Sequence, residues 1–173
     1  MRSIICRELQ CNEQDLPLKD MHIVVDAGNG AGGFFASRVL QPLGANIEGS
    51  LYLDPDGSFP NHIPNPENAK AMEAIRKATV ENHADLGIIF DTDVDRAATV
   101  LSNGKEINKN ALIALMSAIL VKDYPNSTIV TDSVTSDQLE DFLVNRLGLQ
   151  HHRFKRGYRN VINESIRLNN EGI

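Results

Sequence analysis

The chain has 173 residues, of which 42% are hydrophobic and 23% charged, as expected of a globular protein with one large domain or two small ones. Its net charge of −6 argues against nucleic acid as a partner, because non-specific binding requires Lys and Arg to neutralise phosphates. No apolar run is long enough to cross a membrane, no signal peptide is recognisable, and Cys6 and Cys11 are expected to be reduced cytoplasmic thiols.

The first predicted elements are a strand, a glycine-rich turn and a helix. Residues 21–26 form a short apolar run rich in β-branched side chains, and residues 27–33 contain four glycines. Apolar side chains then recur at helical spacing over residues 34–43. A second strand is expected over residues 46–53, and the dense Pro, Gly, Asn and Asp of residues 54–66 predict a loop.

The end of this loop predicts the start of a helix over residues 67–83. Asn65 is expected to cap the helix, with Pro66 at its first position, where proline is favoured. His62, inside the loop, is interpreted as a surface histidine rather than a catalyst. The loop therefore connects a strand to a helix and carries no assigned chemistry at this point.

The remaining elements complete one unit and begin another. Strands are expected at 85–90, 97–101, 128–132 and 149–154, helices at 111–121, 136–147 and 158–168, and a hairpin turn at Asn103-Gly104 leading to 105–107. Strands that alternate with helices predict the α/β class, here a mixed, mostly parallel sheet flanked by helices over residues 1–109. Residues 110–173 predict a truncated second α/β domain, because two strands are too few for an independent sheet.

Three carboxylates alternate directly after the apolar strand at 85–90. They are Asp91, Asp93 and Asp95, and Arg96 follows them. Carboxylates this close repel one another unless a cation lies between them, and a hard divalent ion prefers such oxygen ligands. The position after a strand is also where α/β proteins bind ligands. The pattern therefore predicts a metal site.

Two kinds of phosphoryl chemistry remain open for this cluster. In one, a magnesium loop holds a phosphoryl group and Arg96 acts as its bidentate positive partner. In the other, Asp91 is the nucleophile of a phosphatase of the haloacid dehalogenase type, although Asp95 stands where that motif has threonine. An EF-hand is excluded, because Arg96 and Ser102 stand where that loop requires Gly and Glu.

Two further segments have competing interpretations. The loop Gly28–Gly33 satisfies G-x-G-x-x-G and Glu48 follows at the expected separation, which makes a dinucleotide-binding module an alternative. A tight turn with close backbone packing is the favoured interpretation of this loop. Positive charge gathers in residues 151–159 at a strand–turn–helix junction, which suits either an anion site or a solvated basic turn.

Together, three segments in register resemble the second domain of the α-D-phosphohexomutases, the phosphomannomutases and phosphoglucomutases. The segments are 24–30, 56–67 and 91–96, while residues 131–136 and 154–158 resemble the first part of the family's third domain. The resemblance implies an enzyme that interconverts hexose 1-phosphate and 6-phosphate. In this family a phosphoserine on the first domain exchanges its phosphoryl group with the hexose phosphate through a bisphosphate.

The resemblance also implies roles for particular residues. Asp91, Asp93 and Asp95 would hold Mg²⁺ against the phosphoserine, and Arg96 would stabilise the phosphate. Lys155 would face the substrate as a catalytic and binding group, with Arg156 beside it as a further binding residue. Thr92 stands where the family often has Gly.

Two of the family's active segments have no counterpart in these residues. They are the phosphoserine segment and the Glu-x-Ser-Gly loop that reads the sugar. The chain is therefore expected to be a central fragment that lacks domains I and IV. Such a fragment would carry the metal loop and be inactive alone.

Overall fold

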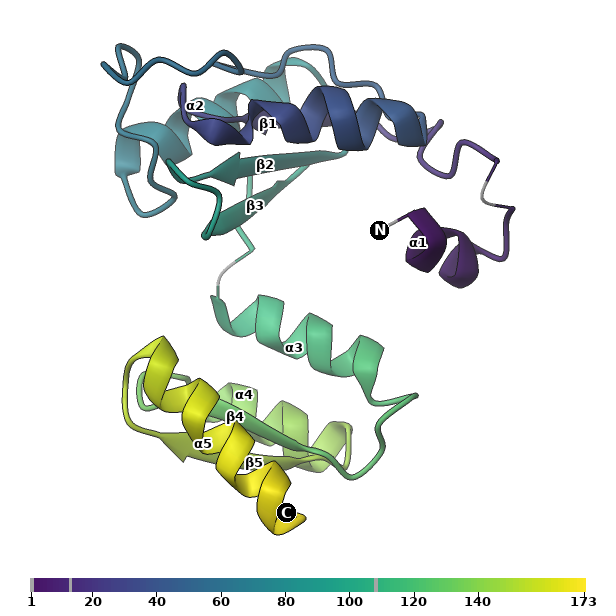
Figure 1. Cartoon of the computed structure of the whole chain (residues 1–173), viewed down its shortest axis with the longest axis vertical. Coiled ribbons are helices and arrows are strands. Elements are labelled where there is room, and N and C mark those ends of the chain that lie inside the picture. The colour runs from purple at the N-terminus through teal and green to yellow at the C-terminus, as the bar shows by residue number, and fades with distance from the viewer. Residues whose placement is uncertain (1, 13, 108) are drawn as a thin grey trace. The chain divides into compact units, whose positions relative to one another are not determined.

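The computed structural model describes residues 2–12, 14–107 and 109–173, and the chain divides into two compact units, residues 1–107 and residues 108–173 (Figure 1). Both units combine helices with a small sheet. The α/β class expected from the alternation of strands and helices is confirmed.

The sheet of the first unit has three strands in the order β1-β2-β3. β1 (Ile23–Asp26) and β2 (Leu86–Phe90) are parallel, with Asp26 opposite Ile89. β3 (Ala97–Leu101) pairs with β2 in the antiparallel sense, so the expected mixed sheet is present. Because β1 and β2 run in the same direction, the segments that follow them leave from the same edge of the sheet.

Both faces of this sheet are covered, and β1 is buried along its whole length. Successive side chains of a strand point to opposite faces. Val24 packs with Ile75 and other residues of α2 (Ala69–Glu81) in one apolar cluster. Val25 packs on the other side with Leu40 of the π-helical segment η2 (Phe35–Leu40). A buried scaffold of this kind holds the end of the sheet rigid.

The strand expected at residues 46–53 is wrong as a continuous element. The segment forms two isolated parallel bridges, one between Asn46 and His22, which precedes β1, and one between Leu51 and Asp26 at the end of β1. Between them the chain turns, since the backbone N–H of Ser50 donates to the carbonyl of Ile47 at 3.2 Å. The apolar residues Ile47, Leu51 and Leu53 are therefore compatible with a chain that contacts the sheet and leaves it between those contacts.

The start of α2 also differs from the expectation. Its N-cap is Asn68, whose side-chain oxygen accepts from the backbone N–H groups of Lys70 and Ala71. The expected cap, Asn65, lies outside the helix, and its side-chain oxygen accepts from the N–H of Glu67 at 2.9 Å. Asparagine suits both a turn and a cap, so composition alone does not choose between the two positions.

The helix α1 (Arg2–Leu9) in the first unit was not expected from the sequence. Cys6 is its buried residue, while Ile4 and Leu9 are exposed. Ile5 and Cys6 lie one turn from Leu9 and Gln10, so the apolar spacing that could have indicated this helix is short and incomplete.

The second unit has two parallel strands, β4 (Thr128–Asp132) and β5 (Gln150–Phe154). Its core contains Leu139, Leu143 and Leu149. The helical elements are α3 (Lys109–Leu120), α4 (Asp137–Asp141) continuing into the π-helical segment η4 (Phe142–Arg146), and α5 (Tyr158–Glu171). No helix in the described residues is long and apolar enough to cross a membrane.

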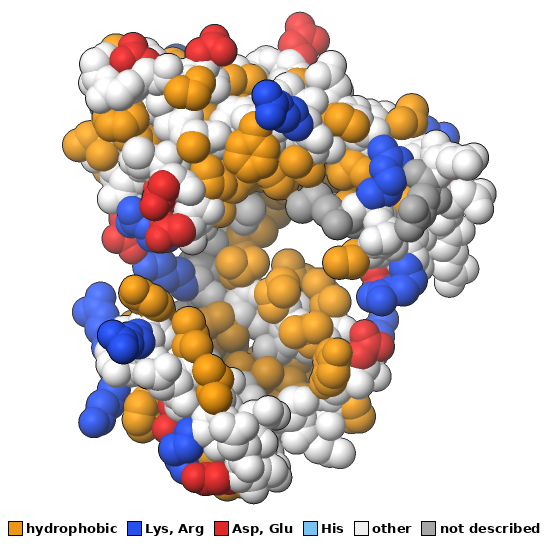
Figure 2. All heavy atoms as spheres, in the orientation of Figure 1, with side chains coloured by type: hydrophobic (Ala, Val, Ile, Leu, Met, Phe, Trp, Pro, Cys, Tyr) orange, Lys and Arg blue, Asp and Glu red, His pale blue; other side chains and the backbone are white. Residues whose placement is uncertain are grey.

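Apolar side chains are prominent on the surface of this second unit (Figure 2). They include residues of α3 that are 41–51% exposed: Leu112, Leu115, Met116, Ile119 and Leu120. Ser117 is the buried residue of α3, while Ile113 and Ala114 pack partly against the core. A helix that is apolar on most sides usually has neighbours on most sides.

Candidate metal centre

The acidic loop connects two antiparallel strands at one edge of the first unit's sheet. Asp91 follows β2 directly, and its backbone N–H donates to the carbonyl of Arg96 at 3.1 Å. Arg96 in turn precedes β3. The loop is thus closed at its base by the strand pairing, and the residues between the two strands form a short, constrained turn.

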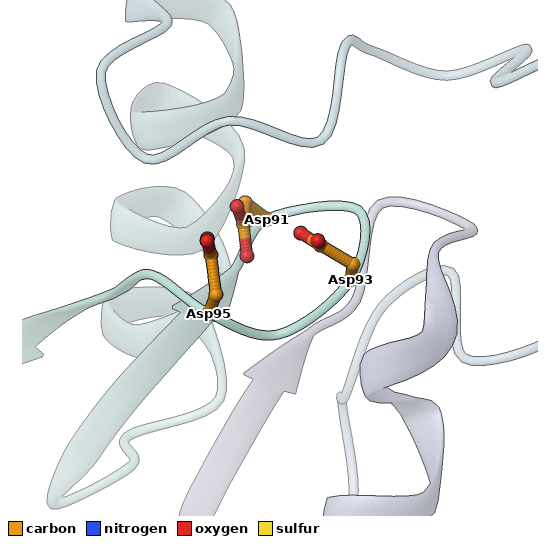
Figure 3. Close-up of side chains that lie close together, drawn as sticks. All are labelled: Asp91, Asp93 and Asp95. Atoms are coloured by element: carbon orange, nitrogen blue, oxygen red, sulfur yellow. The ribbon is translucent and has the colours of Figure 1, made fainter.

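The side chains of Asp91, Asp93 and Asp95 converge within this loop (Figure 3). One carboxylate oxygen of each lies within 4.8 Å of those of the other two. Asp91 is 1% exposed, whereas Asp93 and Asp95 face solvent. Between these two, Val94 has φ 68° and packs against the apolar cluster under the loop. Three carboxylates gathered in this way fit a hard divalent cation.

The charges of the triad act on one another. The Asp91 carboxylate beside Asp95 raises the pKa of Asp95, and repulsion from Asp93 adds to the effect. Burial acts to raise the pKa of Asp91, but the backbone N–H of Arg96, the Asp95 carboxyl and the Arg96 guanidinium outweigh burial and lower that pKa. Asp91 is therefore held as a carboxylate at the buried end of the site.

Arg96 binds the triad rather than extending into solvent. Its Nε donates to Asp91 Oδ2 at 2.9 Å, and its backbone N–H donates to Asp91 Oδ1 at 3.0 Å. Nε also lies 3.4 Å from Asp95 Oδ1. Nη1 donates to the side-chain oxygen of Asn65 at 3.4 Å. Since the side chain remains 55% exposed, its guanidinium is available to an anion as well.

This geometry does not favour Asp91 as a nucleophile. Both of its carboxylate oxygens already accept hydrogen bonds from Arg96, and the residue is buried. A nucleophile of the haloacid dehalogenase type requires an exposed oxygen aimed at a phosphorus atom. The arrangement instead suits a residue that binds a cation and fixes its loop.

The glycine loop packs tightly against its surroundings, which agrees with the close-packing interpretation. A Cβ at Gly33 would lie 1.8 Å from the carbonyl oxygen of Leu53, and one at Gly30 would lie 2.8 Å from that of Thr92. The N–H of Ala31 donates to the same Thr92 oxygen at 2.9 Å. The glycines therefore bring the β1 turn against the acidic loop, and a dinucleotide site is not favoured.

His62 is buried, and its interpretation as a surface histidine is wrong. Its side chain is 2% exposed and its Nε2 lies 2.9 Å from Oδ2 of Asp26, the last residue of β1. Burial raises the pKa of Asp26, against the opposing effects of His62 and the backbone N–H of Gly28. Histidine in a Pro-rich loop gave no sign of burial, because the partner Asp26 precedes it by 36 residues.

The remaining predicted site residues, Lys155 and Arg156, lie in the second unit directly after β5. Both are exposed, and Lys155 Nζ lies 5.9 Å from the centre of the Phe154 ring. Gly157 follows with φ 115°, a backbone conformation that favours glycine, and α5 begins next. The acidic triad and Arg96 are therefore brought together in one unit, and the two basic residues belong to the other.

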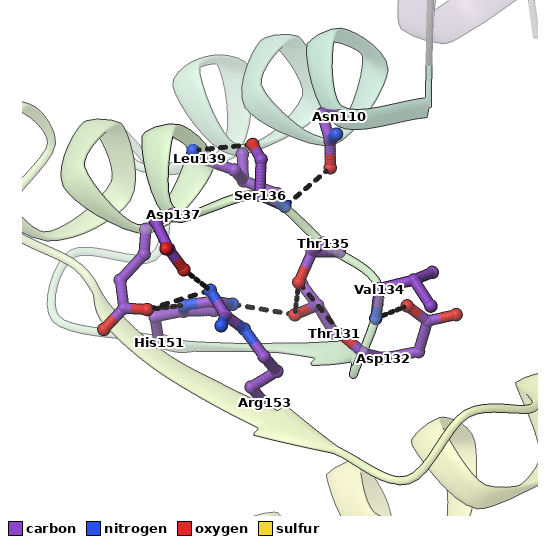
Figure 4. Close-up of polar contacts among 11 residues, drawn as sticks. Asn110, Thr131, Asp132, Val134, Thr135, Ser136, Asp137, Leu139, His151 and Arg153 are labelled. Carbon is purple, nitrogen blue, oxygen red and sulfur yellow. Dashed lines mark hydrogen bonds and ion pairs between the residues drawn. The ribbon is translucent and has the colours of Figure 1, made fainter.

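A polar network lies around β4 and β5 in the second unit, close in sequence to the basic residues Lys155 and Arg156 (Figure 4). His151 Nε2 lies 2.7 Å from the Thr131 hydroxyl, and its ring nitrogen Nδ1 lies 3.6 Å from Glu140. Burial lowers the pKa of His151. Arg153 donates to both Asp137 and Glu140, at 3.0 and 3.1 Å. These contacts join β4, β5 and the start of α4, so the network supports the fold around the basic segment.

Comparisons with known proteins agree with this arrangement. Residues 6–104 match the model of the family described as "Phosphoglucomutase/phosphomannomutase, alpha/beta/alpha domain II". Over 117 residues, 66% of this chain, the sequence is 40% identical to a phosphomannomutase/phosphoglucomutase of Pseudomonas aeruginosa. It is 33% identical over 114 residues, again 66% of the chain, to a phosphoglucomutase of Neisseria meningitidis.

A solved structure is similar over more of the chain. It is an X-ray structure of a phosphoglucomutase/phosphomannomutase family protein from Burkholderia thailandensis, which is 28% identical with a TM-score of 0.78. The match covers 88% of this chain and 32% of that one. The chain spans 24% and 25% of the lengths of the Pseudomonas and Neisseria relatives, about a quarter in each case.

Proposed function

We propose a function from the finding that this chain belongs to the phosphoglucomutase/phosphomannomutase family. The chain would supply the magnesium-binding part of an enzyme that interconverts hexose 1-phosphate and hexose 6-phosphate. The observation that carries the proposal is the convergence of Asp91, Asp93 and Asp95 within 4.8 Å, beside Arg96. Residues 1–109 would correspond to the family's domain II and residues 110–173 to part of its domain III.

The proposed roles follow from what phosphoryl transfer requires, which is alignment and neutralisation of charge. The three aspartates would hold Mg²⁺, which supplies positive charge beside the phosphoryl group when it is bound. Arg96 would keep Asp91 ionised and in place while its exposed guanidinium nitrogens face the phosphate. Lys155 and Arg156, both exposed cations, would bind the substrate from the second unit.

We further propose that these 173 residues do not turn over substrate alone. The sequence contains neither a phosphoserine segment nor a sugar-reading loop of the family's kind, so the group that exchanges the phosphoryl would have to come from further domains. Domains I and IV of a longer chain are the proposed partners, and a hexose phosphate is the proposed substrate. A cytoplasmic location is proposed, because Cys6 and Cys11 are thiols that form no disulfide with each other.

Metal binding is tested first, by calorimetric titration of the chain with Mg²⁺. We expect weak binding, because a shell of three carboxylates leaves other positions of the ion to water or phosphate. Asp93→Asn should weaken the binding about tenfold or more, whereas Asp123→Asn, which removes the same charge from an exposed turn of the second unit, should leave it unchanged. Equal affinity in all three proteins would contradict the assignment.

The mutase activity is tested in a chimera, because the chain alone is expected to be inactive. Residues 6–104 would replace the matching segment of the Pseudomonas aeruginosa relative. The chimera should convert glucose 1-phosphate to glucose 6-phosphate, and Asp93→Asn in it should abolish most of that turnover. A folded chimera without turnover, or an active Asp93→Asn chimera, would count against the proposed function.

A further inference from the structure

A buried histidine–aspartate contact lies near the metal centre without belonging to it. Nε2 of His62 lies 2.9 Å from Oδ2 and 3.1 Å from Oδ1 of Asp26, and the two side chains are 2% and 0% exposed. Oδ1 of Asp26 also accepts from the backbone N–H of Gly28 at 2.8 Å. The pair joins the loop of residues 54–66 to the end of β1.

The surroundings of His62 leave its ring little freedom. The Tyr52 ring meets it edge-on, with 5.3 Å between ring centres. A Cβ built on Gly28 would lie 3.0 Å from its Cε1 and 2.7 Å from Cβ of Pro64. The loop backbone therefore approaches the glycine turn as closely as the absence of a side chain allows. These contacts fix the ring in position as well as in orientation.

Both ring nitrogens face acceptors. Nε2 faces the Asp26 carboxylate, while Nδ1 lies 3.1 Å from the backbone carbonyl of Ile63. The ring therefore lies between two oxygen acceptors, which fix its orientation from both sides. Asp26 and the Tyr52 ring are the titratable groups that these contacts place against His62.

The same loop carries Asn65 to the acidic site. Asn65 lies three residues after His62, with Pro64 restricting the backbone between them. Its N–H donates to the carbonyl of Ile63 at 2.8 Å, the same carbonyl that His62 approaches. Its side-chain oxygen accepts from Nη1 of Arg96. A continuous series of contacts therefore runs from Asp26 through His62 and Asn65 to Arg96.

We propose that His62 is a positioning residue, which locks the 54–66 loop to β1 through Asp26 and thereby holds Asn65 against Arg96. Arg96 has two competing carboxylate neighbours, Asp91 and Asp95. Asn65 offers Nη1 of Arg96 a neutral acceptor at 3.4 Å, which competes with the acidic triad for the guanidinium. The consequence for phosphate recognition rests on the proposed function, but the positioning itself does not.

The inference is tested by NMR on the metal-free 173-residue chain. The probe is the Nε–H signal of Arg96, assigned by its disappearance in Arg96→Lys. Asn65→Ala should shift this signal, because it removes the acceptor of Nη1. His62→Phe, which keeps a ring but removes both ring nitrogens, should shift it in the same direction and raise hydrogen exchange of the Asn65 and Asp56 amides at least tenfold. His62→Gln retains a donor for Asp26 and should restore much of both properties.

A loss of stability alone would not produce this pattern. Ile75→Val removes a methyl group from the buried apolar cluster between α2 and the sheet, in which the aliphatic side chain of Ile75 forms no hydrogen bond with His62 or Arg96, and should leave the Arg96 signal in place. An unchanged Arg96 signal in His62→Phe, or in Asn65→Ala, would overturn the inference, as would an equal shift in Ile75→Val. Because no metal or sugar phosphate is present, failure here would leave the proposed mutase function standing, and failure of that function would not affect this result.

Discussion

Arg96 and Asp91 are bound to each other by three hydrogen bonds that run in both directions. The backbone N–H of Asp91 donates to the carbonyl of Arg96, while the backbone N–H and Nε of Arg96 donate to the two carboxylate oxygens of Asp91. The six-residue loop that carries the acidic triad is therefore closed at its base by the residues at its own two ends. These hydrogen bonds hold the two ends of the loop together through groups of the protein itself.

Removing the Arg96 side chain should destabilise the first unit. In Arg96→Ala, the buried Asp91 carboxylate loses its charged partner but keeps the backbone N–H. We expect a measurable but modest loss in the free energy of unfolding, because Arg96 is half-exposed and solvent screens its contact with Asp91. Urea denaturation followed by circular dichroism measures this loss. Arg38→Ala, on the exposed side of η2, should have little effect, and equal stability of the two variants would contradict the prediction.

Position 33 should not accept a side chain, because Gly33 of the glycine turn packs directly against the backbone of Leu53. Gly33→Ala would place a Cβ 1.8 Å from the backbone oxygen of Leu53, which cannot move aside as a flexible side chain could. We expect a loss of about 3 kcal/mol or more in stability. Gly57→Ala is the matched control, since a Cβ there meets nothing within 4 Å. Thermal melting should separate the two variants clearly, and similar melting temperatures would be evidence against the packing described.

Repulsion within the triad should lower the stability of the metal-free protein, while the same three carboxylates should favour metal binding. In the absence of a cation, Asp93→Asn removes a charge that repels Asp95 and raises its pKa. We therefore expect the variant to melt at a higher temperature than the parent chain in EDTA. Adding Mg²⁺ should stabilise the parent more than the variant, because ligand binding to the folded state raises stability. A lower melting temperature in EDTA would show that repulsion within the triad is unimportant.

In acid, the second unit should lose the stability that the ionised Glu164 carboxylate contributes through Arg167 and His152. Arg167 beside Glu164 lowers the pKa of that buried carboxyl, and His152 adds to the effect. Since the folded-state pKa lies below the unfolded value, the contribution is present above the unfolded pKa and is lost as pH falls through the folded one. Urea melts at pH 7 and pH 3 should show a smaller acid-induced loss in Glu164→Gln. An identical loss in both proteins would refute this account.

The sequence predicted well those elements whose signals are local. The boundaries of β3 and β4 agree with the expected strands at 97–101 and 128–132, because apolar β-branched residues there are bounded by turn residues. The acidic triad was recognisable for the same reason, since its members alternate within one short segment. Its convergence follows from the strand pairing on either side.

Features that depend on distant partners were not predictable in the same way. His62 is buried by Asp26 and Tyr52, which precede it in the chain and meet it only in the fold. The cap of α2 is Asn68 rather than the expected Asn65, and Asn65 instead contacts Arg96, 31 residues further on. The π-helical segments η2 and η4 also fall within apolar patterns that an ordinary helix would share. In each case tertiary contacts decided between local alternatives of similar free energy.

The three aspartates come from five consecutive residues. A cation bound by them would close a very short loop and so would remove little conformational entropy from the unfolded chain. Zinc fingers differ, because their widely spaced ligands make metal binding and folding one event. A cation bound to these three carboxylates would therefore contribute little to folding, and its exchange would be kinetically separate from unfolding.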